Sequence, residues 1–431
     1  MPAIEESVYI DATGEPLTGP TLKPKSISDI DVNPTVLENL ALKNLYMAGS
    51  VSVLELSRKI RLSYAIAEEL VARLQSELLC QVKGMECNIP RIALTSLGRS
   101  QAADLLCQDH YLGAAPVALD SYARQVRKQS LQNVNVHATD MARAFAHLVL
   151  GDETLRQLGT ALNSGSALFL YGPPGTGKTT IAEALSRVLA EDVVWIPYAV
   201  EVDGQIIAVY DPSTHTATPE PAFSDHDSRW VRCHRPAVLV GGELTAEMLD
   251  LQLNPVTKFY VGPVQMKANN GILIIDDFGR QRVRPEDLLN RWIVPLDRRI
   301  DYLTMAGGKK IELPFEILVV FASNIDPDKF VDPAFLRRIK TKIEIGAVPD
   351  EQFCEIFRRV AQDSQVPFDP GVPDALIHFL RHTVHQELRS CYPRDIVDHV
   401  LWEARYEDRK PHLDNSALAR AIAAYFLTKA A

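Results

Sequence analysis

The sequence predicts an α/β fold in which a parallel sheet lies between helices, with a small α+β domain before it and a helical domain after it. Three observations support this fold class. A glycine-rich loop joins an apolar strand to a helix within residues 167–189, a second apolar run ends in the carboxylates Asp276 and Asp277, and helical periodicity dominates the chain after Pro349. Strands that alternate with helices are typical of a parallel sheet covered on both faces.

The glycine-rich loop has the sequence of a phosphate-binding loop. Gly172-Pro-Pro-Gly-Thr-Gly-Lys178-Thr179 fits the pattern G-x-x-x-x-G-K-S/T between a strand and a helix. The glycines let backbone N–H groups point at phosphate oxygens, and the helix adds the positive end of its dipole. Lys178 is expected to reach the β- and γ-phosphates, and Thr179 to bind Mg²⁺. A surface turn is the disfavoured alternative, and the expected nucleotide-binding residues are Gly172, Pro173, Pro174, Gly175, Thr176, Gly177, Lys178, Thr179 and Thr180.

Bulk composition narrows the class of protein. The 431 residues are 46% hydrophobic and 23% charged, as in globular proteins, and the net charge of −10 disfavours non-specific binding of nucleic acid. No apolar run approaches the roughly 18 residues that cross a bilayer, and the acidic N-terminus has no signal-peptide pattern, so no membrane insertion is expected. The six cysteines form no C-x-x-C pair and are expected to be reduced thiols in a cytoplasmic protein.

The N-terminal part of the chain predicts a tail and a small domain. Residues 1–32 are rich in Pro, Gly, Ser and Thr, which favours an extended or disordered tail. Residues 33–112 resemble a winged-helix domain, because three helices, a β-hairpin wing and a closing helix follow one another. With Asn33 as the first N-cap, the helices are expected over 34–47, 52–60, 63–79 and 100–107, and the strands over 79–83 and 91–95.

The charge of the third helix of this small domain indicates which kind of partner the domain binds. Winged-helix domains often bind DNA through that helix. Here it carries Glu68, Glu69 and Glu77 against only Arg73, a balance that repels phosphate. Docking of a protein is therefore favoured over DNA binding, and a purely structural role is the third possibility.

A linker is expected over 113–134, with a locally basic and solvated stretch at 121–130, before a nucleotide-binding domain over 135–348. Two helices, over 138–150 and 152–162, are expected to lead into its first strand.

Residues 199–270 are longer than a minimal α/β fold needs. Long inserts are usually functional, so this one is expected to face a substrate or a pore, with a polar loop at 211–228 and a helix capped by Thr245. Its histidines and cysteine fit no standard zinc spacing, which disfavours a metal site at His215, His226, Cys233 and His234. Either a pore loop or the core is expected to contain Phe259, Tyr260 and Met266.

A second motif lies where a central strand is expected to end. Residues 270–280 place four apolar residues before two carboxylates. An aspartate at this point lies beside the phosphate-binding loop and can hold Mg²⁺, the role assigned to Asp276. The next carboxylate can act as general base on the attacking water, the role assigned to Asp277. A plain Asp-Asp turn is the alternative, which the earlier phosphate-binding loop disfavours.

Taken in order, these motifs resemble those of the AAA+ ATPases over about residues 135–430. The glycine-rich loop and the carboxylate pair resemble the Walker A and Walker B motifs. Asn324 ends a strand where the family has sensor 1. Arg337 and Arg338 stand in a segment that resembles the arginine finger, and Arg394 resembles sensor 2 in a helical lid over 349–431.

Within that family, two stretches resemble the MoxR, magnesium-chelatase and NtrC-like branches. These are residues 268–277 and the following helix over 288–296, and a β-hairpin over 299–313 is also usual there. One residue departs from the family pattern. Asp277 stands where the family usually has Glu and is one methylene shorter, so slow hydrolysis is one expected consequence.

The resemblance implies a protein that binds and hydrolyses Mg-ATP in a ring such as a hexamer. In this family an arginine completes the site of the neighbouring subunit, which is the role expected of Arg337 and Arg338, with stabilisation of a helix dipole as the alternative. Arg394 is expected to contact the γ-phosphate, and a surface pair with Asp398 is its alternative.

The expected function is chaperone-like remodelling of a protein client. An ATP-controlled DNA-binding regulator or motor is the rival, and a switch that binds ATP but hydrolyses little is the third possibility.

Overall fold

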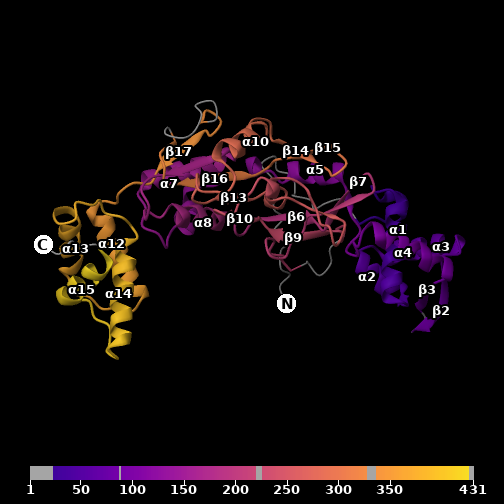
Figure 1. The fold of residues 1–431 in the computed structure, drawn as a ribbon, viewed down its shortest axis with the longest axis horizontal. Helices are drawn as coiled ribbons and strands as arrows, with labels where there is room; N and C mark the ends of the chain where they lie inside the picture. Colours follow the sequence, from indigo (N-terminus) through magenta and orange to yellow (C-terminus); the bar gives the residue numbers. More distant parts are fainter. Residues whose placement is uncertain (1–22, 87–88, 220–225, 328–335, 427–431) are drawn as a thin grey trace, which may run out of the picture.

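The computed structural model describes residues 23–86, 89–219, 226–327 and 336–426. Figure 1 shows an elongated molecule with a helical C-terminal region at one end, the N-terminal helices at the other, and two sheets between them. No helix in the described part of the chain is both long enough and apolar enough to cross a membrane.

The central feature is a five-stranded sheet in which every pair of neighbours is parallel. Its side chains alternate between two faces, as the two-residue period of a strand requires. Leu168 and Leu170 pack into one buried cluster and Phe169 into the other. The strands, in spatial order, are β10 (Ala237–Val240), β13 (Ile272–Ile275), β16 (Leu318–Ser323), β5 (Leu168–Tyr171) and β17 (Thr341–Glu344).

Helices cover both faces of this sheet, which confirms the α/β prediction. The helices on one face are α6 (Ala138–Ala144), α7 (Asp152–Ser164) and α8 (Lys178–Val188). Those on the other face are α9 (Val264–Ala268) and α10 (Pro285–Arg298), whose Trp292 is fully buried against the sheet. The helix expected over 138–150 is shorter than predicted, because it ends at Ala144.

The C-terminal region is helical, as expected. It packs around its own core, which includes Phe353, Phe357, Leu376 and Val400. Its helices are α12 (Asp350–Asp363), α13 (Val372–His382), α14 (Tyr392–Tyr406) and α15 (Asn415–Tyr425).

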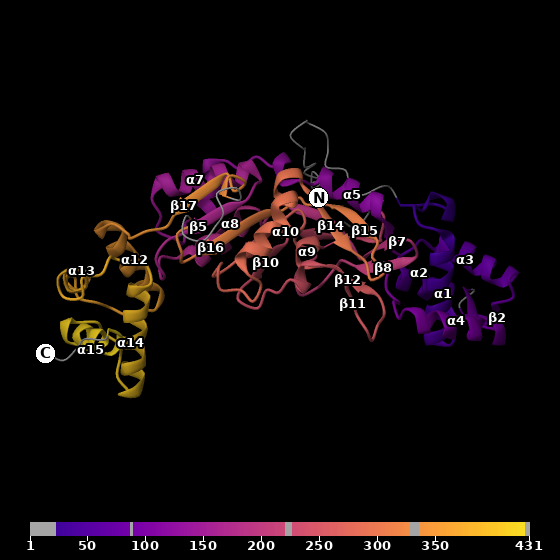
Figure 2. The ribbon, with the colours of Figure 1, turned by 45° about the horizontal axis from the view of Figure 1, so that its top comes forward.

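The insert and the expected linker form a second, mixed sheet with its own core (Figure 2). Its strands in spatial order are β11 (Gln252–Leu253), β12 (Tyr260–Val261), β8 (Gln205–Ala208), β7 (Ala199–Val202) and β4 (Val117–Ala118). Two antiparallel pairs accompany it: β6 (Val193–Pro197) with β9 (Trp230–His234), and the expected hairpin of β14 (Ile300–Thr304) with β15 (Lys310–Pro314).

The structure differs from the expected linker over 113–134. That segment supplies β4, the helix α5 (Leu119–Lys128) and the 3-10 turn η2 (Leu131–Asn133). Tyr122 and Val126 of α5 are buried in the core of the second sheet, so α5 has a packed face as well as a solvated one.

Two expectations for the insert are decided by its packing. Tyr260 and Met266 are buried in the core and do not line a pore loop, while Phe259 packs against the N-terminal core. Thr245 caps no helix, because the next helical turn is a short 3-10 segment, η3 (Glu247–Leu249), preceded by Ala246.

The N-terminal region contains the helices and hairpin that its sequence predicts. They are α1 (Pro34–Ala48), α2 (Val53–Ile60), α3 (Tyr64–Ser76) and α4 (Ser96–Gln108), with β1 (Val51–Ser52), β2 (Cys80–Glu86) and β3 (Ile89–Leu94) in the order β1-β3-β2. Asn33 caps α1 as expected, by accepting a hydrogen bond from Thr35 N. The winged-helix likeness of this region stays a prediction.

The expected N-terminal tail, residues 1–32, is in part ordered. Ile27, within the 3-10 turn η1 (Ile27–Asp29), and Val32 are buried in the N-terminal core because they supply apolar surface to α3. Residues 1–22 lie outside the described residues.

Candidate nucleotide-binding site

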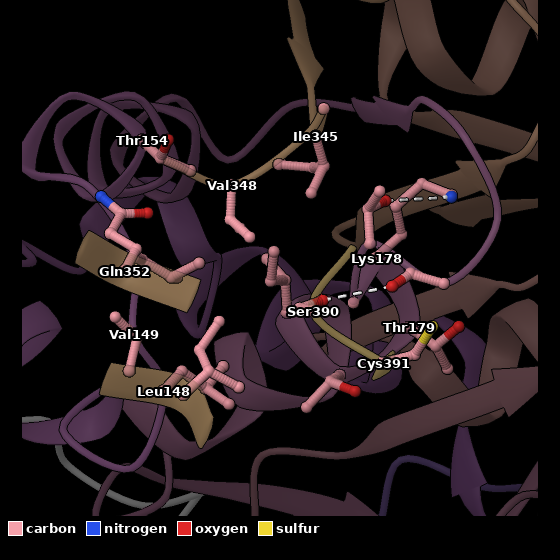
Figure 3. Close-up of a pocket in the computed structure, with 18 of the residues that line it drawn as sticks. Leu148, Val149, Thr154, Lys178, Thr179, Ile345, Val348, Gln352, Ser390 and Cys391 are labelled. Atoms are coloured by element: carbon pink, nitrogen blue, oxygen red, sulfur yellow. Dashed lines mark hydrogen bonds between the residues drawn. The ribbon is translucent and has the colours of Figure 1, made fainter. Parts of the chain in front are cut away.

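A cleft of about 760 Å³ lies at the carboxyl ends of the parallel strands. The phosphate-binding loop forms its floor, the loop between α6 and α7 forms one side, and the C-terminal helices close the other (Figure 3). Ligands of open parallel sheets bind at this edge, because the strand ends and the helix N-termini converge there.

The phosphate-binding loop has the backbone that its glycines predict. Gly175 has φ +79°, a left-handed conformation that disfavours any side chain, and its missing Cβ leaves room for Cys391. All residues from Pro174 to Thr180 line the cleft. Lys178 is buried, and its ammonium donates hydrogen bonds to the carbonyl oxygens of Gly172 (3.0 Å) and Pro173 (2.7 Å).

Burial and neighbouring charges act on Lys178 in opposite directions. Burial lowers its pKa, the carboxylates of Asp276 and Asp277 raise it, and the guanidinium of Arg389 lowers it, with a net lowering. The loop therefore holds a partly desolvated ammonium, which favours binding of an anion.

Two hard oxygen donors meet beside the loop. The hydroxyl of Thr179, in the first turn of α8, donates to the two carboxylate oxygens of Asp276 at 2.9 and 3.0 Å. Asp276 directly follows β13, so strand and loop bring together the pair that the sequence predicts. Mg²⁺ prefers carboxylate and hydroxyl oxygens and keeps several waters, so this open pair fits the ion without a full protein cage. The described residues contain no cluster of three or more acidic, histidine or cysteine ligands.

Asp277 and Asn324 also come together, which the sequence did not predict. The Asn324 amide donates to Asp277 Oδ1 at 2.8 Å, and both side chains line the cleft. Asp277 has φ +49°, a left-handed conformation that aspartate tolerates better than most residues. Its exposed carboxylate lies where a water could approach a nucleotide in the cleft.

The C-terminal helices contact the phosphate-binding loop directly. The Cys391 N–H and the Ser390 hydroxyl donate to the carbonyl oxygen of Gly175 at 3.1 and 3.3 Å. Figure 3 shows Ser390 and Cys391 against the loop. Arg394 lines the cleft with 69% of its side chain exposed, and its ion partner at 3.9 Å is Asp395 and not Asp398.

The two finger candidates lie away from this cleft. Arg337 is exposed, and Arg338 pairs with Asp297 of α10 at 2.8 Å. Neither lines the cleft of its own chain. The preceding part of the segment, residues 328–335, is outside the described residues.

Sequence reasoning missed the walls of the cleft. They are formed by Leu148, Val149, Ile345, Val348 and Ile356, with the polar side chains of Thr154 and Gln352 among them (Figure 3). These residues lie in two loops and in helices α7 and α12, and no local motif marks them. An apolar slot that leads to a phosphate-binding loop suits a nucleoside attached to a polyphosphate.

Two family models match segments of the chain that line the cleft. The model of the "ATPase family associated with various cellular activities (AAA)" matches residues 168–208, and that of a "Domain of unknown function (DUF8689)" matches residues 349–424. No curated protein matches the chain.

Solved structures are similar at low identity. NtrX from Brucella abortus in complex with ADP is similar over 77% of this chain and 67% of its own, with 13% identity and a TM-score of 0.41. The RuvB Holliday junction branch migration motor of Thermotoga maritima is similar over 64% of this chain and 70% of its own, with 14% identity and a TM-score of 0.37.

Proposed function

Because the chain is an AAA+ ATPase by its nucleotide-binding domain, we propose that it binds Mg-ATP in this cleft and hydrolyses it as an oligomeric ring to remodel a protein client. The observation that carries the proposal is the convergence of Lys178, the Thr179–Asp276 pair and the Asp277–Asn324 pair at one end of one cleft. A phosphate-binding loop alone would support binding only, whereas the second pair supports hydrolysis.

Each residue has a separate role in this proposal. The loop N–H groups and Lys178 bind the phosphates, and Thr179 and Asp276 would hold Mg²⁺, which neutralises charge on the phosphate oxygens when bound. Asp277 accepts the proton of the attacking water as general base. Asn324 orients the Asp277 carboxylate through their hydrogen bond, and Arg394 reaches the phosphates from the lid.

The ring is proposed from the position of Arg337 and Arg338. Stabilisation of the γ-phosphate by an arginine is worth orders of magnitude in rate. Arg337 and Arg338 lie away from the cleft of their own chain, so in this proposal they act on the cleft of a neighbour in a ring such as a hexamer.

The client is proposed to be a protein bound by the N-terminal region in the cytoplasm. The one basic residue of α3, Arg73, is already paired with Glu69 (3.1 Å) and Glu38 (3.6 Å). Glu68 and Glu77 remain exposed on the same helix, which leaves it poorly suited to contact DNA phosphates.

A switch that hydrolyses little is the second candidate. It is favoured by Asp277, whose side chain is shorter than glutamate and is already bound to Asn324.

The test is the ATP hydrolysis rate per subunit, measured with Mg²⁺ over a range of protein concentrations. A rate that rises with concentration supports sites completed between subunits. Arg337→Ala and Arg338→Ala should keep ATP binding and lose hydrolysis in at least one case, while Arg405→Ala, an exposed lid arginine, serves as the control. Clear ATP binding with no hydrolysis at any concentration would instead favour the switch.

A further inference from the structure

Besides Arg394, the lid contains Arg389, whose guanidinium has no carboxylate partner within the described residues. Arg389 lies between α13 and α14, and no carboxylate within the described ranges forms an ion pair with it. Its Nε is buried and has no hydrogen-bond acceptor. Its guanidinium carbon stands 5.8 Å from the centre of the Tyr392 ring, a contact that orients the group but does not neutralise it.

This arginine lies directly against the phosphate-binding loop. Its Cδ is 3.7 Å from the position that a Cβ on Gly175 would occupy, so its stem covers the glycine at the tip of the loop. The next two residues, Ser390 and Cys391, donate to the carbonyl oxygen of that same glycine. Three consecutive lid residues therefore contact one residue of the loop.

The position of the charge also matters. Both cations lie at the phosphate-binding loop: Arg389 lies against Gly175, and Lys178 follows three residues further along the same loop. Two cations held close together and partly desolvated repel each other until an anion lies near both. A buried donor without an acceptor has the same requirement.

We propose that Arg389 is a second phosphate-binding residue of the lid, which contacts the polyphosphate of the nucleotide bound by Lys178. The inference rests on the proposed binding of ATP in this cleft. Arg394 is expected to contact the γ-phosphate, and Arg389 would add a second positive charge from the lid. Arg394, which lines the cleft, is 69% exposed, so solvent screens its charge more strongly.

A consequence is that the lid and the loop respond to the same phosphates. Arg389 is continuous with the two residues that hold the loop tip, so a phosphate that draws the guanidinium also fixes the lid against Gly175. ATP and ADP, which differ by one phosphate, should therefore hold the lid differently.

The variant that isolates the charge is Arg389→Met, because methionine keeps an unbranched apolar stem over Gly175 and removes the guanidinium. Arg405→Met is the matched control, since Arg405 is an exposed arginine of α14 that does not line the cleft. The measurement is equilibrium binding of ATP, ADP and AMP to the full chain with Mg²⁺, together with the unfolding temperature of each variant.

Arg389→Met should weaken ATP binding about 10- to 100-fold, the range of one charge-assisted hydrogen bond, and should weaken AMP binding much less. Arg389→Lys should restore part of the loss, because it keeps the charge but not the planar fork. Arg405→Met should bind all three nucleotides as the parent chain does.

Three outcomes would overturn the inference, and they are distinguishable. If Lys178→Ala loses ATP but Arg389→Met binds ATP, ADP and AMP with unchanged affinities, the proposed function stands and the role of Arg389 is wrong. If the parent chain binds no ATP at all, both are wrong. An equal loss for ATP and AMP, with a lowered unfolding temperature, would show that Arg389 only packs the lid.

Discussion

The two sheets of this protein differ in the direction of their strands. In the parallel sheet, strands from β13, β16 and β5 all end at one edge, and the residues that follow them are Asp276, Asn324 and the phosphate-binding loop. The second sheet is mixed, so its strand ends point in both directions and gather no such set. A common direction of strands concentrates chemistry at one edge, whereas a mixed sheet builds a scaffold.

Just before strand β9, beside the second sheet, buried polar side chains bind one another. Arg229 is 3% exposed and binds Asp227 (2.7 Å), Asp31 (3.1 Å) and the carbonyl oxygen of Pro116 (2.9 Å). This cluster joins the insert to the N-terminal region. In the cleft, by contrast, the side chains of Lys178 and Asp277 line open space.

The two sheets meet at the amino end of β13, opposite to Asp276. Asn269 donates to the Tyr122 hydroxyl at 2.9 Å, and Asn270 donates to the carbonyl oxygen of Val126 at 2.7 Å. Both asparagines are buried, and their hydrogen bonds attach α5 to the amino end of β13, the strand that Asp276 and Asp277 follow. The comparison therefore predicts that changes in one sheet affect stability and changes at the edge of the other affect nucleotide chemistry.

The largest expected effect is at Asp277. Asp277→Asn keeps an acceptor for the Asn324 amide but removes the proton acceptor, so ATP hydrolysis should fall about 10²- to 10⁴-fold with ATP binding retained. Steady-state hydrolysis and equilibrium binding would be measured, with the exposed Asp287→Asn as the control. Hydrolysis at the parent rate would assign the general base to another group.

The next effect is on stability and lies just before strand β9, which accompanies the second sheet. Arg229→Met leaves two carboxylates without their partner and should lower the free energy of unfolding by about 3–5 kcal/mol. Denaturant unfolding would measure the loss. The control is Arg232→Met, on the adjoining strand β9, since Arg232 forms no ion pair within the described residues. ATP affinity of the folded variant should be unchanged. A parallel fall in affinity would show that the two sheets are not independent.

Lys178→Ala should have the opposite effect: a loss of ATP affinity with little change in stability. It should weaken ATP binding about 10- to 100-fold, because a buried ammonium no longer meets the phosphates, while the unfolding temperature changes little. Titration with ATP and thermal unfolding of the same samples would check both parts, with the exposed Lys310→Ala beside them. Unchanged ATP binding would remove the site from this loop.

The smallest effect is a pH dependence. The pKa of Lys178 is lowered in the ligand-free chain, so the ammonium loses its proton at a lower pH than an ordinary lysine. Phosphates favour the charged form, and ATP affinity should therefore fall as pH rises through that pKa, by at most about tenfold per pH unit for one proton. Lys178→Arg, which stays charged, should lack the dependence. An affinity independent of pH up to the ordinary lysine range would contradict it.

Local sequence was enough to predict the parallel sheet and the helices of both terminal regions, and it marked the loop and the carboxylates that line the cleft. The phosphate-binding loop depends on glycines and a lysine that are adjacent in the chain, and the pairing of Thr179 with Asp276 follows from the common edge of parallel strands. Helix periodicity likewise acts over a few residues, which is why α1, α12 and α14 lie where it predicts.

Only the tertiary structure decided the rest. Strands of two residues such as β4, β11 and β12 are too short to show a period. Because β4 pairs with β7 from 83 residues further along the chain, local sequence does not predict that the linker and the insert share one sheet. The Asn324–Asp277 pair and the contact of Arg389 with Gly175 join distant segments whose meeting depends on packing. The sequence by itself determined where the glycine-rich loop and the two carboxylates lie along the chain, and the packing of the lid and the strands decided which side chains meet them.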